Sequence, residues 1–520
     1  MRTQNAAINS IFTIIQKIIE TVLSFIYRTM FIQILGVTYL GVNGLFTNIF
    51  SVLSLMELGV GSSIIFLLYK PLVEKDTEKI KTYMKFYALM YRIIAIFIGM
   101  AGIALIPFLK YIVKTDVEIP DMIPIYILML LNTVSSYLFA YKRSILEADQ
   151  KAYYNSINYS IFNAANTIIR LLVLAILKNF IATLIVSVIV NLLSNIEISH
   201  RVNKMYPYLK EKNVKHMDKS QLYEVIKRMK AIMMHKIGNV VITSTDNIIL
   251  SSMISIAVVG IYSNYSMITN IIYTTVSLVF VSITASVGNL KVTETPKKSE
   301  TVFNEMLFMN FFIYYVISVV SWSMFNDLIQ TWIGSEYVFD SGIVFLIIMQ
   351  LYISGMRHTP VTFLNSSGLN YNSRFKPFAE AIINLTVSII GVKIFGISGV
   401  ILGTIIAYLT CSVWVEPHIL YKHWFKKSSI KYFLRYFGYM GLTILTTFLS
   451  RYITSFISIE GWIGVILKFI LSGLIAVTIF IIMFFKTEEY KYYINVIKNF
   501  KDSVKSKLIE RRKIKSEKTV

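Results

Sequence analysis

The sequence has little of what a soluble protein or an enzyme needs. Charged residues make up 15% of its 520 residues, whereas soluble globular proteins have about 25%. A single cysteine, Cys411, excludes a disulfide framework and any metal cluster built on cysteines. No glycine-rich phosphate loop, hydrolase elbow or dinucleotide-binding fingerprint is present. We therefore expect no enzymatic activity, no cofactor and no structural metal.

Long apolar runs take the place of these features. Hydrophobic residues make up 55% of the chain, and the mean hydropathy is +0.62. A helix needs about 20 apolar residues to cross the hydrocarbon core of a bilayer, which is about 30 Å thick. The sequence thus predicts an all-α polytopic membrane protein with about 14 transmembrane helices. They are 8–35, 40–69, 83–109, 122–141, 153–177, 180–200, 231–255, 257–290, 302–326, 341–368, 374–395, 396–421, 431–457 and 461–485.

The positive charge of the chain predicts its orientation. Lys and Arg number 51 against 29 Asp and Glu, a net charge of +22. With the N-terminus inside, 38 Lys and Arg fall in inner segments, five in outer segments and eight within spans. Because Lys and Arg concentrate on the cytoplasmic side, both termini of this bilayer protein are expected in the cytoplasm. Nucleic-acid binding is not expected.

Two halves of the chain resemble each other. Gly41 aligns with Gly260 at an offset of 219 residues, and Tyr153 and Asn166 align with Tyr371 and Asn384 at an offset of 218. Two lobes in the same orientation are typical of a parallel repeat about the membrane normal; chance alignment of apolar helices is the alternative. The division expected is an N-terminal six-helix lobe 1–200, a basic cytoplasmic linker 201–230, a C-terminal six-helix lobe 231–421, additional helices 13 and 14 in 422–485, and a basic cytoplasmic tail 486–520.

Polar side chains form stripes inside several spans. On the first helix, Ser24 and Arg28 share one face with Lys17 at 100° per residue. Because charges in hydrocarbon are costly, these stripes predict a water-filled central cavity between the lobes; hydrogen bonding between helices is the alternative for Ser and Thr. The predicted cavity cations are Lys17, Arg28, Arg170, Lys236 and Arg357, and the predicted cavity polar residues are Ser24, Glu57, Asn163, Asn166 and Thr243.

The cations suit an anionic substrate, because Arg and Lys pair with phosphate. One acid in the seventh span, Asp246, has a different potential role. Intramembrane carboxylates commonly mark ion paths, so Asp246 could hold a coupling Na+ or H+. A structural salt bridge to Lys236 or another cavity cation is the alternative, and the sequence leaves both open.

Several motifs resemble a known transporter family. They are LGVTYLGVNGL at 35–45, LSLMELGVGSS at 53–63, LYKPL at 68–72 and GISGVILG at 396–403. Together they resemble the polysaccharide transporter (Wzx-type lipid-linked oligosaccharide flippase) family of the multidrug/oligosaccharidyl-lipid/polysaccharide (MOP) exporter superfamily. The resemblance covers nearly the whole chain. Family members often have twelve helices, so the last pair here departs from the pattern.

The resemblance implies alternating access by two six-helix lobes around a central cation-lined cavity. The implied substrate is a polyprenyl-pyrophosphate-linked oligosaccharide, moved from the inner to the outer leaflet for a capsule, an exopolysaccharide or a related polymer. Basic residues of the first helix serve related flippases, and here they correspond to Lys17 and Arg28. The resemblance also implies a coupling-ion site of Asp246 with Glu380, Asn384 or Thr404. Polysaccharide-assembly proteins would be the partners.

Two other functions remain open. One is a drug/cation antiporter of the same superfamily, although such a cavity is expected to favour acidic groups over these cations. The other is a membrane polymerase or ligase acting on lipid-linked sugars, which would need a larger outer loop than the longest one here, 327–340. In the tail, Tyr490, Ile494, Ile497 and Phe500 have near-helical spacing and suit binding to the anionic inner leaflet. A simply solvated tail is the alternative.

Overall fold

The computed structural model describes residues 2–57, 60–115, 118–119, 121–211, 214, 217–218, 222–223, 225–226, 229, 240, 244–499 and 502. Side chains are described from residue 19 onward, without those of Met56, Ser62, Phe139 and Asn370. Regular structure in these residues is helical throughout, and they contain no strand. The predicted class, an all-α polytopic membrane protein, is confirmed.

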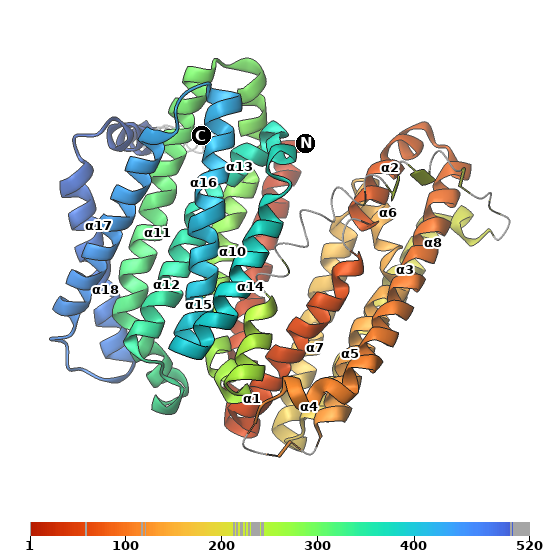
Figure 1. Cartoon of the computed structure of the whole chain (residues 1–520). Coiled ribbons are helices and arrows are strands. Elements are labelled where there is room, and N and C mark those ends of the chain that lie inside the picture. The colour runs from red at the N-terminus through yellow and green to blue at the C-terminus, as the bar shows by residue number, and fades with distance from the viewer. Residues whose placement is uncertain are drawn as a thin grey trace, which may run out of the picture. The chain divides into compact units, whose positions relative to one another are not determined.

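The chain forms two compact units (Figure 1). Unit 1 consists of Met1–Ile271 and Arg374–Ala407, and unit 2 of Ile272–Ser373 and Tyr408–Val520. These boundaries differ from those of the predicted repeats, because one unit collects segments from both halves of the sequence. The predicted lobes 1–200 and 231–421 concern internal symmetry, and they stay a prediction.

Unit 1 is built on long apolar helices joined by short turns. Within it α3 packs against α5, α5 and α7 pack against α8, and α1 packs against α7. Its elements are α1 (Arg2–Leu53), η1 (Ser54–Glu57), α2 (Val60–Glu74), α3 (Thr77–Leu105), η2 (Ile106–Phe108), α4 (Leu109–Ile112), α5 (Met122–Ala140), α6 (Arg143–Ala148), α7 (Tyr153–Leu177), α8 (Phe180–Met205), η3 (Pro207–Lys210), a helix over 244–253, the first part of α10 (Ile256–Thr293), α14 (Lys376–Phe395) and α15 (Ile397–Ala407).

Unit 2 is arranged around α11, against which α12, α17 and α18 pack (Figure 1). The predicted extra helices 13 and 14 are α17 and α18, and Tyr315 of α11 donates a hydrogen bond to Thr446 Oγ1 of α17 over 3.2 Å. Besides the second part of α10, the elements are α11 (Pro296–Ile333), η4 (Ser335–Tyr337), α12 (Ser341–Met356), α13 (His358–Ser367), η5 (Leu369–Ser373), η6 (Tyr408–Ser412), α16 (Val413–Leu420), η7 (Tyr421–Phe425), α17 (Ile430–Thr454), α18 (Gly461–Phe484) and a helix over 488–499.

Ten helices in the described residues are long and apolar enough to span a bilayer, and Met122–Leu138 is a shorter apolar one. The difference from fourteen has identifiable causes. The first predicted span and the start of the second both lie in α1, where the non-helical Gly36, with φ 83°, separates two helical parts. The second span then continues through η1 into α2. Twelve of the 25 residues of the predicted span 231–255 lie outside the described residues. The predicted span 431–457 corresponds to α17, which is long enough to cross a bilayer. Its Tyr and Thr residues make it less apolar than the ten helices counted above.

The segment after α18 forms the helix expected in the tail. It covers 488–499, with Ile494 and Ile497 exposed. Tyr493 donates a hydrogen bond to the carbonyl of Glu305 over 3.1 Å, and Glu489 pairs with Arg435 over 3.0 Å. These contacts attach the first part of the tail to unit 2. The rest of the predicted tail, including Phe500, lies outside the described residues.

Candidate functional site

Arg28 is a membrane cation whose contacts are with neutral side chains. It lies in α1, where its Nε donates to Asn264 Oδ1 over 2.6 Å and its Nη2 donates to Ser263 Oγ. Both acceptors belong to α10, and neither carries a charge to offset that of the guanidinium. In the described part of the chain no carboxylate pairs with Arg28. The site is therefore cationic as well as partly buried.

The two helices approach each other closely beside this arginine. A Cβ built on Gly41 of α1 would lie 2.0 Å from the carbonyl oxygen of Ile256, and one on Gly260 would lie 2.3 Å from that of Val37. Only glycine permits this approach, because any side chain would meet backbone atoms. Ser263 follows Gly260 by one turn and donates to its carbonyl over 2.7 Å. The glycine crossing thus sets the position of the groups that hold Arg28.

A second set of the predicted polar residues lies on α7, which packs against α1. Arg170 donates from Nη2 to Tyr27 Oη over 2.6 Å, and its guanidinium lies 4.3 Å from the Tyr27 ring centre. Among the described residues, Arg170 Nε and Asn166 Oδ1 are buried without a hydrogen-bond partner. Such atoms normally bind water or a ligand. A second cation thus lies next to α1, beside polar atoms able to bind something else.

Ser24 and Asn163 occupy less buried positions. Ser24 is exposed on α1, and Asn163 of α7 is half-buried and accepts from Thr167 Oγ1 at its carbonyl over 3.0 Å. Arg28, Arg170, Ser24, Asn163 and Asn166 are called the α1–α7 cationic site below. Lys17 has no described side chain, and Lys236 and Thr243 lie outside the described residues.

Glu57 lies at the end of a hydrogen-bonded row of hydroxyl groups. Ser144 donates to Tyr87 over 3.1 Å, Tyr87 donates to Tyr91 over 3.0 Å, and Tyr91 donates to Glu57 Oε1 over 2.7 Å. The row crosses from α6 through α3 to η1. Gly61 leaves space for it, since a Cβ there would lie 2.9 Å from Tyr87 Oη. Its contacts assign Glu57 to the packing of these helices.

Asp246 forms a buried cluster with two of the residues that the family resemblance implied. Asn384 Nδ2 donates to Thr404 Oγ1 over 2.8 Å, and Thr404 Oγ1 donates to Asp246 Oδ2 over 3.0 Å. These three side chains are each at most 6% exposed. Asp246 Oδ1 has no hydrogen-bond partner among the described residues. The expected salt bridge to Lys236 involves a residue outside them.

The atoms around Asp246 suit a small hard cation or a proton. Hard cations take oxygen ligands, and the cluster offers a carboxylate oxygen and the Thr404 hydroxyl. The free Oδ1 is the atom on which a cation or a proton would be held. Glu380, one turn before Asn384 on α14, is 1% exposed and pairs with Lys376 over 3.6 Å. Its own cation thus offsets its charge.

Arg357 differs from Arg28 because a carboxylate holds it. Its Nη2 and Nε donate to Glu416 Oε1 and Oε2 over 2.6 and 3.2 Å, and Glu416 is 2% exposed. The arginine lies between α12 and α13, and Tyr408 covers it with its ring centre 4.9 Å from the guanidinium carbon. The sequence analysis did not single out Glu416, although an acid within an apolar span is itself a recognisable signal.

The fold was compared with those of known proteins. No family model matches the sequence, and no curated protein matches it. Solved structures do match. The lipid II flippase MurJ, in an inward closed conformation, superimposes with a TM-score of 0.69 at 16% identity, over 92% of this chain and 100% of that one.

Multidrug transporters match over most of their length as well. An inward-facing multidrug resistance MATE family transporter of the MOP superfamily gives a TM-score of 0.61 at 13% identity, over 77% of this chain and 94% of that one. A mutant of the Vibrio cholerae MATE transporter VcmN gives 0.54 at 13%, over 81% and 99%. At such identities the likeness shows the fold. This chain shares its fold with the flippase MurJ and with a MATE transporter of the MOP superfamily.

Proposed function

We propose that the protein is a flippase of the bacterial cytoplasmic membrane. It moves a polyprenyl-(pyro)phosphate-linked oligosaccharide from the inner to the outer leaflet for cell-surface polysaccharide assembly. The observation that carries this proposal is Arg28, an intramembrane arginine held by the neutral side chains of Ser263 and Asn264. An anionic substrate supplies the charge that these contacts lack.

The chemistry of Arg28 favours a phosphate. Guanidinium groups bind phosphate through parallel N–H donors, and such charge-assisted hydrogen bonds are about twice as strong as neutral ones. Arg170 adds a second cation beside α1, and its Nε, which has no hydrogen-bond partner among the described residues, can donate to a phosphate oxygen. A lipid-linked diphosphate needs such a site, whereas a cationic drug would be repelled by it.

The likeness in fold supports the same conclusion independently. MurJ is a lipid II flippase by its description, and its whole chain aligns with this one. A MOP fold supplies a route across the bilayer, and the α1–α7 cationic site supplies a preference for negative charge. We infer that Arg28 holds the diphosphate head while the polyprenyl chain stays in lipid, and that alternating access then exposes the head to the outer side.

We further propose that the Asp246 cluster couples transport to Na+ or H+. Occupation of Asp246 Oδ1 by a cation would neutralise a carboxylate in a site that is otherwise buried. Because a buried uncompensated charge is costly, the ion would favour the conformation in which the cluster stays closed. A gradient of that ion would then reset the transporter after each cycle.

The test locates the lipid-linked oligosaccharide after depletion of the protein. Sealed vesicles treated with a lectin or a glycosidase report the leaflet on which the sugar lies. We expect it to accumulate on the inner face, with polymer lost outside. Cells that carry Arg28→Ala should show the same accumulation at normal protein abundance, whereas Lys393→Ala, which removes an exposed cation from the end of α14, should behave as wild type.

The other functions give different results. Oligosaccharide that reaches the outer face of depleted cells but stays unpolymerised would contradict translocation and favour a polymerase or ligase. Loss of cationic-dye efflux with an unchanged sugar distribution would favour a drug/cation antiporter; one of the structural neighbours is described as a multidrug resistance MATE family transporter. Assembly proteins that process the exported oligosaccharide are the expected partners in the first case only.

A further inference from the structure

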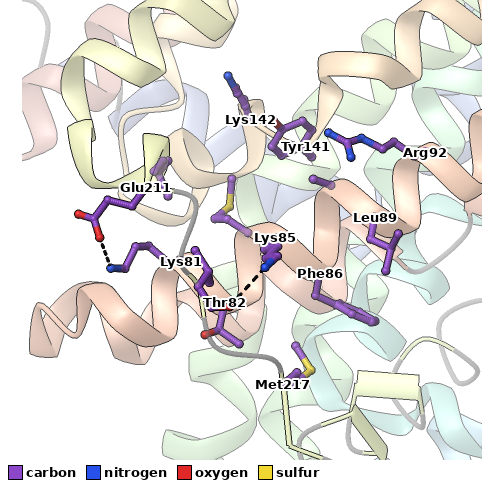
Figure 2. Close-up of a pocket in the computed structure, with 14 residues that line it drawn as sticks. Lys81, Thr82, Lys85, Phe86, Leu89, Arg92, Tyr141, Lys142, Glu211 and Met217 are labelled. Carbon is purple, nitrogen blue, oxygen red and sulfur yellow. Dashed lines mark hydrogen bonds and ion pairs between the residues drawn. The ribbon is translucent and has the colours of Figure 1, made fainter.

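A cavity of about 420 Å³ lies in unit 1, away from the α1–α7 cationic site. It is called the α3 pocket here. Its walls come from α3, from the link between α5 and α6, and from Leu209, Glu211, Val214 and Met217 (Figure 2). The lining combines four cations with one carboxylate and a series of apolar side chains. The cations are Lys81, Lys85, Arg92 and Lys142, and the carboxylate is Glu211.

Only one of these cations has a carboxylate partner among the described residues. Lys81 pairs with Glu211 over 2.6 Å. Lys85 donates to the carbonyl of Val214 over 3.3 Å, and Lys142 donates to two neutral oxygens, Ser199 Oγ and Asn203 Oδ1, over 2.7 and 2.9 Å. Figure 2 shows Arg92 and Lys142 on either side of Tyr141 at one end of the pocket. The pocket thus keeps an excess of positive charge.

The environment of Lys142 is unfavourable for a cation that has no anion nearby. Burial lowers the pKa of its ammonium group, and the positive charge of Lys210 lowers the pKa further. Both effects raise the free energy of the charged form. An anion bound beside Lys142 would remove this disadvantage. Fixed neutral oxygens, such as those of Ser199 and Asn203, offset it only in part.

The same face of α3 continues as exposed apolar surface. Lys85, Leu89, Arg92 and Ile96 follow one another at the spacing of one helix face, and Leu89 and Ile96 are 51% and 59% exposed. Met100, one turn further, is 61% exposed. At 1.5 Å per residue, the cations and apolar side chains together extend over about 20 Å. A ligand with a charged head and a long apolar chain fits both parts.

We propose that the α3 pocket binds the phosphate of an anionic phospholipid, with an acyl chain lying along Leu89, Ile96 and Met100. The orientation expected from the sequence puts this end of α3 on the cytoplasmic side, so the lipid comes from the inner leaflet. Basic pockets between helices on this side of a membrane suit anionic head groups. A free phosphate would use the charge of the pocket but not the apolar face beyond it.

The experiment counts bound lipid by native mass spectrometry. The full chain is purified in detergent and titrated with phosphatidylglycerol, or with phosphatidylcholine of the same acyl chains. We expect wild type to retain phosphatidylglycerol preferentially. The double variant Arg92→Gln/Lys142→Gln should bind it at least about tenfold more weakly, because two charge-assisted hydrogen bonds are lost. The charge-preserving variant Arg92→Lys should stay close to wild type.

Lys297→Gln is the matched control, because it removes an exposed cation from the first turn of α11 in unit 2. Its retention of phosphatidylglycerol should equal that of wild type. Equal binding of the two lipids, or unchanged binding by a correctly folded double variant, would overturn the proposal. If inorganic phosphate at tens of millimolar displaces the lipid and stabilises lipid-free protein, the pocket serves a soluble phosphate instead. If the double variant fails to fold, the single variant Arg92→Ala is measured in the same assay, and its binding of phosphatidylglycerol decides the proposal.

Discussion

The arginines inside the membrane-spanning helices differ in what compensates their charge. Arg28 contacts the neutral side chains of Ser263 and Asn264, whereas Arg357 forms two hydrogen bonds with Glu416. A neutralised arginine contributes to stability and conformation, but it offers little attraction to an anion. For this reason the phosphate contact proposed above belongs to Arg28, and Arg357 is chiefly a partner of Glu416.

Removing one partner of the Arg357–Glu416 pair should destabilise unit 2. Glu416→Ala leaves a buried guanidinium without its carboxylate, and such a loss costs about 3–5 kcal/mol. We expect a clear fall in the midpoint of thermal unfolding in detergent. The double variant Arg357→Met/Glu416→Ala should recover much of it, because no unpaired charge remains. Glu488→Ala changes an exposed acid and should leave the midpoint unchanged; an equal fall in this control would show that the pair has no special role.

Asp246→Asn should abolish any dependence of transport on an ion gradient. The substitution keeps the size of the side chain and its acceptor for Thr404 but removes the negative charge that would hold Na+ or release H+. Transport into vesicles with imposed Na+ or pH gradients measures the effect. Thr245→Val changes a neighbouring residue, 3.5 Å from Asn384, without altering the charge. Gradient-dependent transport by Asp246→Asn would confine Asp246 to a structural role.

At the residue scale, the sequence predicted positions better than partners. Helical periodicity placed Arg28 and Arg170 on polar faces, and the structure gives both of them contacts between α1 and its neighbours. Periodicity describes one helix at a time, so it could not show that Glu416, 59 residues along the chain, neutralises Arg357. The same limit applies to Glu57, whose hydroxyl partners come from another helix.

The element that presents Asn384 and Thr404 is the tight hairpin of α14 and α15. Its two helices meet at glycines: a Cβ on Gly399 would lie 2.1 Å from the backbone of Gly391, and one on Gly403 would lie 2.1 Å from Ser388 Oγ. The absence of side chains lets the backbones approach, as in other membrane helix pairs. This approach brings Asn384 Nδ2 within 2.8 Å of Thr404 Oγ1.

Gly399→Ala should therefore loosen both the hairpin and the Asp246 cluster. The added methyl group meets backbone atoms that no rotamer change can move, and overpacking of this kind costs about 1–3 kcal/mol. We expect a lower unfolding midpoint and weaker ion dependence of transport. Gly438→Ala on α17 is the matched control, since a Cβ there has nothing within 4 Å. If both variants have the same midpoint, glycine packing does not hold the hairpin.

At the scale of the elements, some helix boundaries could be predicted from the sequence and others could not. The gap expected between the first two spans falls at Gly36, where positive φ bends α1. Because Gly36 is not helical, the chain on either side of it forms two separate helical parts. The two π-helical segments η6 and η7 were not foreseen, since their hydrogen bonding has no hydropathy pattern.

At the scale of the whole molecule, the internal duplication stays a prediction, and two pairs of aligned residues can be located in the structure. Lys178 and Gly396 are 218 residues apart, and each has positive φ between two consecutive helices. Gly41 and Gly260, 219 apart, lie against each other. Two residues related by a twofold axis can touch only close to that axis. If the predicted parallel repeat is correct, its axis passes between α1 and α10.

The orientation of the chain in the membrane can be tested by labelling cysteines introduced at chosen positions. Cys411 is the single cysteine and is buried, so background labelling should be low. Introduced cysteines at exposed positions then report their side of the membrane. A membrane-impermeant maleimide should label Lys110→Cys in intact cells, because the charge distribution puts residue 110 outside. Lys297→Cys should react only after permeabilisation.

This labelling pattern decides more than topology, because the α3 pocket and the direction of transport both depend on it. Residues 77–92 of α3 belong to the inner side only if the N-terminus is inside, and an inner-leaflet lipid can reach Lys85 only then. Cys411→Ser without an introduced cysteine supplies the unlabelled control. Labelling of Lys297→Cys in intact cells would reverse every assignment of side. The α3 pocket would then face the outer leaflet, and the positive charge of the chain would no longer follow the rule that Lys and Arg stay inside.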